Sequence, residues 1–133
     1  MEEVLKFLSD NPTFFVATVD GDKPRVRPFG FFMAYENHLY FGVGSHKKAC
    51  QQMRANPYVE ISTASAKGEW IRISGKAVFD ERPETISRVM QSMPTLKSIY
   101  NEISGLKIAP FYLEQARAEI ADFNGNFKEI VLS

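Results

Sequence analysis

The chain has 133 residues, a length that fits one domain with its own hydrophobic core. Its 16 basic and 16 acidic residues give a formal net charge of zero, which argues against a general binder of nucleic acid or of anionic membranes. The single cysteine, Cys50, excludes an intrachain disulfide and favours a reducing cytoplasm.

Signals for export, membrane insertion and metal binding are missing from the sequence. The acidic start is too short in apolar residues for a signal peptide, and no run approaches the ~20 apolar residues that span a bilayer. No Cys/His cluster has the spacing of metal ligands. We therefore expect one soluble, cytoplasmic domain over residues 1–133, without nucleic-acid, membrane or metal partners.

The N-terminal part predicts one helix and then antiparallel strands. Apolar residues at helical spacing predict a helix over residues 2–9. β-Branched and aromatic residues predict strands over 13–19, 23–33 and 39–43. The turn Asp20-Gly21-Asp22 makes the first two strands a hairpin, and residues 35–38 form the next turn.

The middle of the chain predicts a second helix and a second pair of strands. A helix is expected over 47–55 with Ser45 as its N-cap, followed by strands over 58–64 and 69–80. Gly75 lies inside the last of these strands and indicates a bulge or tight bend, as barrels require.

The C-terminal part predicts helices and then a hairpin at Asn124-Gly125. The helices are expected over 82–93 and 94–102, the pattern of 106–113 is ambiguous, and strands are expected over 116–123 and 127–132. A small, closed or nearly closed β-barrel with flanking helices, mainly β in class, accounts for this order. A parallel doubly wound sheet does not, because consecutive strands lack crossover helices.

The residues from Lys23 to Met33 indicate a phosphate-binding strand. Arg25 and Arg27 are two apart and point to the same face of an extended chain. Pro28 removes a ladder donor, and Gly30 permits close approach of a ligand. Together with the neighbouring phenylalanines, these residues could hold a phosphate beside a flat apolar ring.

A second cationic segment follows the third predicted strand. The Ser45 hydroxyl and the free N–H groups at the start of the next helix would face an anion, with Lys47 and Lys48 as point charges. Alternatively, both lysines are solvated, and the two arginines pair with Glu36 or Glu60.

No acid, base or nucleophile stands out from the sequence. Trp70 could contact a bound aromatic ring or could be an ordinary interface or core tryptophan. His46 lies next to two lysines, which favours its neutral form, and Cys50 lies on the predicted inner face of a helix, where a packing role is expected. If the protein is an enzyme, a cofactor must supply the reactivity.

Four blocks of the sequence resemble the pyridoxamine 5′-phosphate oxidase-like family of FMN-binding split barrels. The blocks are F-F-V-A-T-V-D-G-D-K-P-R-V-R-P-F-G, L-Y-F-G-V-G-S-H-K-K-A, N-P-Y-V-E-I-S and G-E-W-I-R-I-S-G-K-A, in the family's order. The resemblance spans residues 2–123 and implies a six-stranded antiparallel split barrel with flanking helices. It also implies a homodimer that holds FMN at the subunit interface.

The resemblance assigns FMN-binding roles to residues of all but the third block. It places Arg27 at the phosphate or ribityl chain, Phe29 and Gly30 along the isoalloxazine ring, and Trp70 just before the strand that reaches the partner's flavin. The loop with Ser45 holds the phosphate in the family, and Lys48 is preferred over Lys47 as its lysine. The cofactor-binding candidates are Arg25, Arg27, Pro28, Phe29, Gly30, Phe41, Gly42, Ser45, Lys47, Lys48 and Trp70.

The chain also departs from the oxidases that name the family. They are longer and bind pyridoxal phosphate through a C-terminal segment with Arg and His, for which this sequence has no match. We therefore expect an FMN-dependent oxidoreductase with another small-molecule substrate. An F420-dependent reductase of the same fold, or a flavin or small-ligand binding or sensor protein without turnover, are the alternatives.

Overall fold

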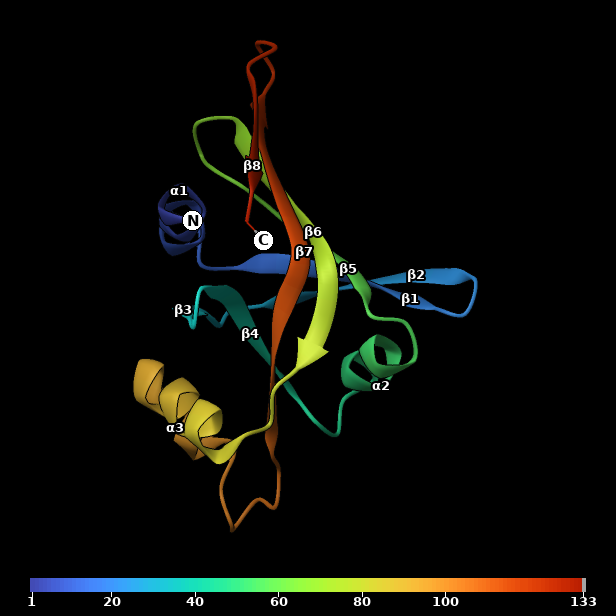
Figure 1. Ribbon diagram of the computed structural model, residues 1–133, viewed down its shortest axis with the longest axis vertical. Coiled ribbons are helices and arrows are strands. Elements are labelled where there is room, and N and C mark those ends of the chain that lie inside the picture. The colour runs from blue at the N-terminus through green and yellow to red at the C-terminus, as the bar shows by residue number, and fades with distance from the viewer. Residues whose placement is uncertain (133) are drawn as a thin grey trace.

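Eight strands within residues 1–132, which the computed structural model describes, form one antiparallel sheet (Figure 1). The sheet order is β2-β1-β5-β6-β7-β4-β3, and β8 pairs with β7. The strands are β1 (Phe14–Asp20), β2 (Lys23–Phe29), β3 (Phe32–Tyr35), β4 (His38–Gly44), β5 (Tyr58–Ala64), β6 (Glu69–Phe79), β7 (Ile108–Asp122) and β8 (Phe127–Val131). The helices are α1 (Glu2–Asp10), α2 (Lys48–Ala55), α3 (Pro83–Ser92) and the short 3-10 helix η1 (Pro94–Ser98).

The two ends of this sheet are consecutive in the chain. β2 pairs only with β1 and β3 only with β4 among the described strands, and residues 30–31 connect β2 to β3. The prediction of one strand over 23–33 is therefore wrong, because the chain crosses here from one end of the sheet to the other. The sheet has eight strands, whereas the family resemblance implied six. The mainly antiparallel β fold with flanking helices is confirmed, and the sheet is a barrel split between β2 and β3.

The long strands β6 and β7 bend where the sequence predicted a bulge. Their pairing shifts register between Ser74 and Lys76, which confirms the prediction at Gly75. A Cβ on Gly75 would lie 3.0 Å from the Cβ of Leu113, so another residue here would have to push β7 slightly away. The ambiguous residues 106–113 belong mostly to β7 (Ile108–Asp122), which is nearly twice as long as the strand predicted over 116–123.

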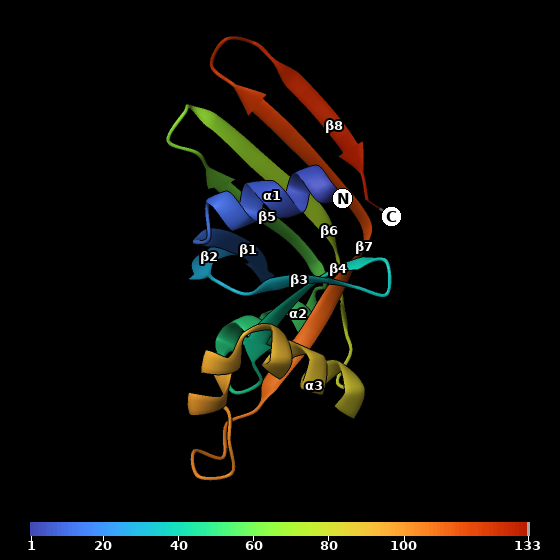
Figure 2. The ribbon, with the colours of Figure 1, turned by 90° about the vertical axis from the view of Figure 1, so that its left-hand side faces the viewer.

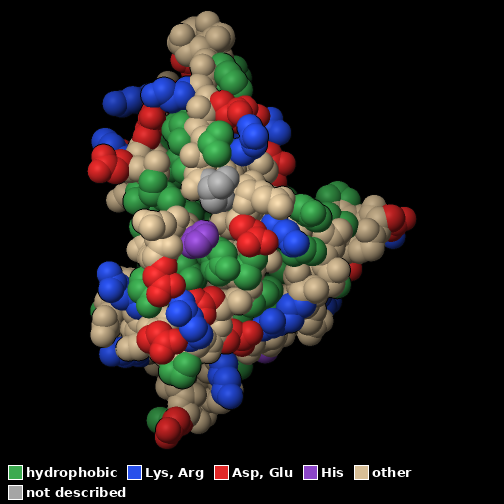
Figure 3. Space-filling model, in the orientation of Figure 1, with side chains coloured by type: hydrophobic (Ala, Val, Ile, Leu, Met, Phe, Trp, Pro, Cys, Tyr) green, Lys and Arg blue, Asp and Glu red, His purple; other side chains and the backbone are tan. Residues whose placement is uncertain are grey.

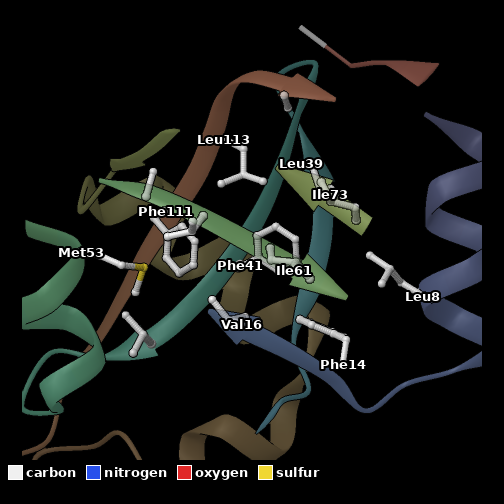
Figure 4. Packing of buried hydrophobic residues seen from close by; sticks show 14 of the residues in the cluster. Leu8, Phe14, Val16, Leu39, Phe41, Met53, Ile61, Ile73, Phe111 and Leu113 are labelled. Atoms are coloured by element: carbon white, nitrogen blue, oxygen red, sulfur yellow. The ribbon is translucent and has the colours of Figure 1, made fainter. Parts of the chain in front are cut away.

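Aromatic and aliphatic side chains from both halves of the sheet form the main core (Figure 4). Phe41 lies at its centre, edge-on to Phe14 at 5.5 Å and stacked on Phe111 at 5.7 Å between ring centroids. Leu8 of α1 and Met53 of α2 pack in this core and attach the two helices to the sheet. Each such side chain stabilises the fold by about 1.5–3 kcal/mol on burial.

A second, smaller core lies under α3, at the other end of the sheet from α1 (Figure 2). Val89 of α3 packs with Phe31, Met33, Tyr40 and Ile108, which come from the β2–β3 connection, β3, β4 and β7. This cluster places α3 and η1 beside the gap between β2 and β3. The predicted helix over 94–102 is shorter than expected, because η1 ends at Ser98.

A buried carboxylate fixes the start of α3. One oxygen of Asp80 accepts hydrogen bonds from the hydroxyls of Tyr40, at 2.7 Å, and Thr85, at 2.8 Å. The other accepts from Nε of Arg82 at 2.8 Å, and the same guanidinium donates to Glu36 at 2.7 Å. The bond from Arg82 above all, with those from Tyr40 and Thr85, holds the pKa of Asp80 well below its ordinary value.

The surface is mixed in charge. Lys, Arg, Asp and Glu side chains are interspersed over the face in Figure 3, in keeping with the formal net charge of zero. None of the described helices has both the length and the apolar character that crossing a membrane requires.

We predict that Tyr40→Phe destabilises the protein by about 1.5–3 kcal/mol at pH 7, because Asp80 loses a hydrogen bond to its charged form. The carboxylate's contribution is complete above its ordinary pKa of about 3.9 and declines as the pH falls below that value. The difference between variant and wild type should therefore narrow in acid. Urea unfolding at pH 7 and pH 3, followed by Trp70 fluorescence, measures it.

Tyr58→Phe is the matched control, since Tyr58 is 59% exposed and should tolerate loss of its hydroxyl. A Tyr40→Phe protein that matches this control at pH 7 would show that the Asp80 cluster does not hold α3 in place.

Candidate functional site

The pairing of β1 with β2 places both strand arginines on the side of the sheet that faces α2. Arg27 lies opposite Val16 and Arg25 opposite Thr18. The guanidinium of Arg27 donates to Oε1 of Gln52 at 2.6 Å and to the Thr18 hydroxyl at 2.8 Å. Burial, and then the nearby charge of Arg25, lower the pKa of Arg27. Arg27 is therefore a cation held in place by its neighbours.

Arg25 has a different partner from those the sequence suggested. Its Nε lies 3.1 Å from Asp20 in an exposed ion pair. The alternative in which the arginines pair with Glu36 or Glu60 is wrong, because these carboxylates bind Arg82 at 2.7 Å and Arg72 at 2.9 Å. Glu60 on β5 pairs with Arg72 on the neighbouring strand β6, and Glu36 in the turn before β4 pairs with Arg82 before α3.

The loop between β4 and α2 presents backbone donors. The prediction of Ser45 as N-cap is wrong: Lys47 is the N-cap, since its carbonyl accepts the first helical hydrogen bonds, from the N–H groups of Cys50 and Gln51. The N–H of Lys47 donates to the Gly44 carbonyl at 3.0 Å and closes the turn before the helix. Within the described residues, the N–H groups of Lys48 and Ala49 have no backbone acceptor, as is usual in a first helical turn. These groups and the helix dipole favour an anion at this end of α2.

A cleft of about 230 Å³ joins this loop to the break between β2 and β3. One wall comes from β2 and the residues after it, another from β4 and the start of α2, and a third from the segment that follows α3. The lining residues are Arg27, Pro28, Phe29, Gly30, Phe31, Gly42, Val43, Gly44, Lys47, Ala49, Met93, Leu96, Tyr100 and Ile108. Arg27 and Lys47 are the charged groups of this lining, and no carboxylate is part of it.

Two glycines of β4 let side chains approach the cleft wall closely. A Cβ on Gly42 would lie 2.9 Å from Cδ1 of Ile108. A Cβ on Gly44 would lie 2.7 Å from the His46 ring and 3.1 Å from the Tyr100 hydroxyl. Real Cβ atoms do not tolerate the shorter of these distances, so any other residue at either position would force the Ile108 or His46 side chain to move.

The cleft brings together six of the predicted cofactor-binding residues: Arg27, Pro28, Phe29, Gly30, Gly42 and Lys47. Ser45 and Lys48 lie on the adjoining loop and first helical turn but not in the lining, and Arg25 lies two residues along β2. Phe41 is fully buried in the main core. Trp70 lies at the start of β6, outside the cleft lining, and packs its ring edge-on against Phe123, with centroids 4.9 Å apart.

Eight residues of the cleft lining were not among the predicted candidates, and three of them come from a segment that had no predicted role in the site. Met93, Leu96 and Tyr100 reach the cleft from the end of α3, from η1 and from the turn that follows. Burial raises the pKa of the Tyr100 hydroxyl. The apolar residues of the predicted helix over 82–93 indicated that this helix packs against the rest of the protein. More than 50 residues separate the helix from β2, so only the fold could show that its end lies beside the cleft.

The two reactive side chains noted in the sequence do not reach the cleft lining. Cys50 is buried in the main core, as predicted, and burial raises the pKa of its thiol. His46 is exposed, with its ring against Gly44. In the described residues, no His, Cys, Asp or Glu lines the cleft, which therefore offers cations, backbone donors and apolar walls.

Comparisons with known proteins agree with this geometry. A family model described as pyridoxamine 5′-phosphate oxidase matches residues 1–109. A NimC/NimA family protein from Clostridium acetobutylicum is 38% identical, with a TM-score of 0.90, covering 98% of this chain and 90% of that one. No curated protein matches the chain.

More distant solved structures share the fold. A pyridoxamine 5′-phosphate oxidase-related, FMN-binding protein from Nostoc punctiforme is 12% identical, with a TM-score of 0.66, over 99% of this chain and 95% of that one. A heme-binding protein from Mycobacterium smegmatis is 12% identical, with a TM-score of 0.72, over 98% of this chain and 57% of that one. Since the family model covers most of the sequence and the Clostridium relative almost all of it, the chain belongs to the pyridoxamine 5′-phosphate oxidase family, with its split-barrel fold.

Proposed function

We propose that the protein is a cytoplasmic, FMN-binding oxidoreductase that works as a homodimer on a small-molecule substrate. The observation that carries the proposal is the composition of the cleft, whose lining combines two cations, Arg27 and Lys47, with largely apolar side chains and three glycines. FMN has the same polarity, because it joins a phosphate to a flat ring system.

The residues of the cleft fit the two ends of FMN. Arg27 and Lys47, with the free N–H groups of Lys48 and Ala49, would bind the phosphate. The ring system would lie along residues 29–31 and 42–44, where nothing beyond its two chain neighbours lies within 4 Å of the Cβ position of Gly30, which leaves the backbone open to a ligand. Met93 and Leu96 would exclude water from the ring.

FMN, when bound, supplies the hydride chemistry through its N5 atom. The chain's own residues would anchor the phosphate, orient the ring and keep the site dry. F420, the alternative cofactor, has a longer anionic tail and calls for more basic residues than the two that line the cleft. The composition of the cleft therefore favours FMN.

A flavin-binding protein without turnover is the second candidate function. It is favoured by the absence of any His, Cys, Asp or Glu from the cleft lining in the described part of the chain. If the protein does turn over a substrate, the proton would have to come from Tyr100, from solvent or from a second subunit.

The size of the cleft supports a homodimer. Its volume of about 230 Å³ lies below the ~300–1,000 Å³ of typical ligand pockets, so one subunit would leave part of FMN uncovered. The outer face of the β1–β2 hairpin is apolar, with Phe15, Ala17 and Val26 on it, and Val26 is 67% exposed. Such a face favours a second copy as its cover.

We predict that Lys47→Ala weakens FMN binding by about 1.5–3 kcal/mol, or roughly 10- to 150-fold, because one charged hydrogen bond is lost. Lys48→Ala is the matched control. Two double variants, Arg27→Ala/Lys47→Ala and Arg27→Ala/Lys48→Ala, should bind FMN more weakly than the single lysine variants. Titration followed by flavin fluorescence gives the affinities. A larger loss in Lys48→Ala would assign the phosphate to Lys48, and unchanged affinity in both double variants would refute the site.

We predict saturable oxidation of NADH or NADPH by the FMN-loaded protein under anaerobic conditions, with quinone, nitro or flavin compounds as acceptors. The Lys47→Ala variant should oxidise the nicotinamide more slowly than wild type at limiting FMN. At saturating FMN its rate should return to the wild-type value, because the role of Lys47 is to bind the cofactor. Absorbance at the nicotinamide band follows the reaction. A loaded protein that binds FMN but shows no saturable turnover would support the binding or sensor function instead.

We predict that Val26→Glu converts a dimer into a monomer, because it places a charge in the apolar face of β2. Ile103→Glu is the control, since Ile103 is 99% exposed on the loop before β7. Sedimentation velocity measures both masses. Equal masses for wild type and Val26→Glu would remove this face from the interface.

A further inference from the structure

A second cavity, larger than the cleft, lies between α3 and the loop that leads into β7. Its volume is about 540 Å³, and it shares Tyr100 and Ile108 with the cleft, so these two residues form the wall between the two spaces. We call it the α3 groove. The residues that line it are Glu81, Ile86, Met90, Tyr100, Asn101, Glu102, Gly105, Leu106, Lys107 and Ile108.

The α3 groove is apolar inside and polar at its rim. Ile86 and Met90 lie one helical turn apart on α3, half-buried, and Leu106 faces the same space from the loop. Of the rim groups, Glu81 is already bound to Arg54 at 2.6 Å. The remaining charges, Glu102 and Lys107, are exposed and opposite in sign. The interior therefore favours an uncharged ligand.

The polar atoms of Asn101 are already occupied. Its side-chain nitrogen donates to the Lys97 carbonyl at 2.9 Å, and its side-chain oxygen accepts from the N–H of Ser104 at 2.9 Å. These bonds hold the loop in shape and leave Asn101 little capacity to bind a ligand.

Tyr100 is different, because its hydroxyl has no hydrogen-bond partner among the described residues. The half-buried ring stands in the wall between groove and cleft, with the hydroxyl next to Gly44. Burial raises the pKa of this hydroxyl, so it stays protonated at neutral pH and can donate. Since Gly44 lines the cleft, the hydroxyl lies at the boundary between the two spaces, and a ligand in the groove would reach this neutral donor at that boundary.

We propose that the α3 groove binds a small, planar, uncharged molecule with a ring carbonyl, of the bicyclic quinone type, whose carbonyl oxygen accepts a hydrogen bond from Tyr100. The volume lies within the ~300–1,000 Å³ range of small-molecule sites, and the apolar walls with one donor match such a molecule. The inference rests on the proposed function only in making this molecule the substrate; its binding requires no cofactor.

Binding is tested on the FMN-free protein with dimethylnaphthoquinone, whose two methyl groups block addition of a thiol, and with dimethylnaphthalene, which lacks the carbonyls. We expect amide shifts of Leu106, Lys107 and Ile108 in NMR titrations, with none at Phe127. Tyr100→Phe should weaken quinone binding about 3- to 10-fold, since one neutral hydrogen bond is lost, and should leave naphthalene binding unchanged. Tyr58→Phe is the matched control.

Met90→Trp provides a second test, because its larger side chain would fill the groove from α3. It should reduce binding of both compounds at least tenfold while FMN binding is kept. Quinone shifts that map to β1–β2, or affinities that neither variant changes, would overturn the proposal. Failure of FMN to bind would instead remove the proposed function and leave this binding result standing.

Discussion

The carboxylate of Asp80 connects three parts of the structure that carry the candidate site. It accepts hydrogen bonds from Tyr40 on β4, from Thr85 on α3 and from Arg82 between β6 and α3. A buried charge with one of these partners missing would be costly, so the three elements are held in one arrangement. That arrangement brings Met93 and Tyr100 to the cleft, and its wall and the adjoining groove both depend on it.

The two cavities divide the chemistry between them. The cleft has Arg27 and Lys47 in its lining and is suited to an anion attached to a ring, whereas the α3 groove keeps its charges at the rim. Tyr100 belongs to both, and its hydroxyl lies 3.1 Å from the Cβ position of Gly44. The absence of a side chain at this glycine therefore allows the close approach of Tyr100 to β4, in the wall between the two spaces.

Much of the fold followed from local patterns. The hairpin turns, the bulge at Gly75 and the placement of Cys50 in the core were all predicted, because turn residues and alternating burial depend on near neighbours. The wrong predictions have two sources, a local turn at the start of α2 and strand partners that lie far away in the chain. Ser45 is not a cap because the turn at Gly44 moves the helix start to Lys47, and the strand over 23–33 breaks where the chain crosses the sheet.

The sequence by itself determined the order of strands and helices, the family resemblance and the pair of segments that carry Arg27 and Lys47. Hydrophobic periodicity and motif spacing are properties of contiguous residues, so they can be read without a fold. The tertiary structure decided which charges are paired and which side chains close the cleft. Those outcomes depend on contacts between residues far apart in the chain, such as Arg27 with Gln52 and Tyr100 with Gly44, which packing of the whole sheet creates.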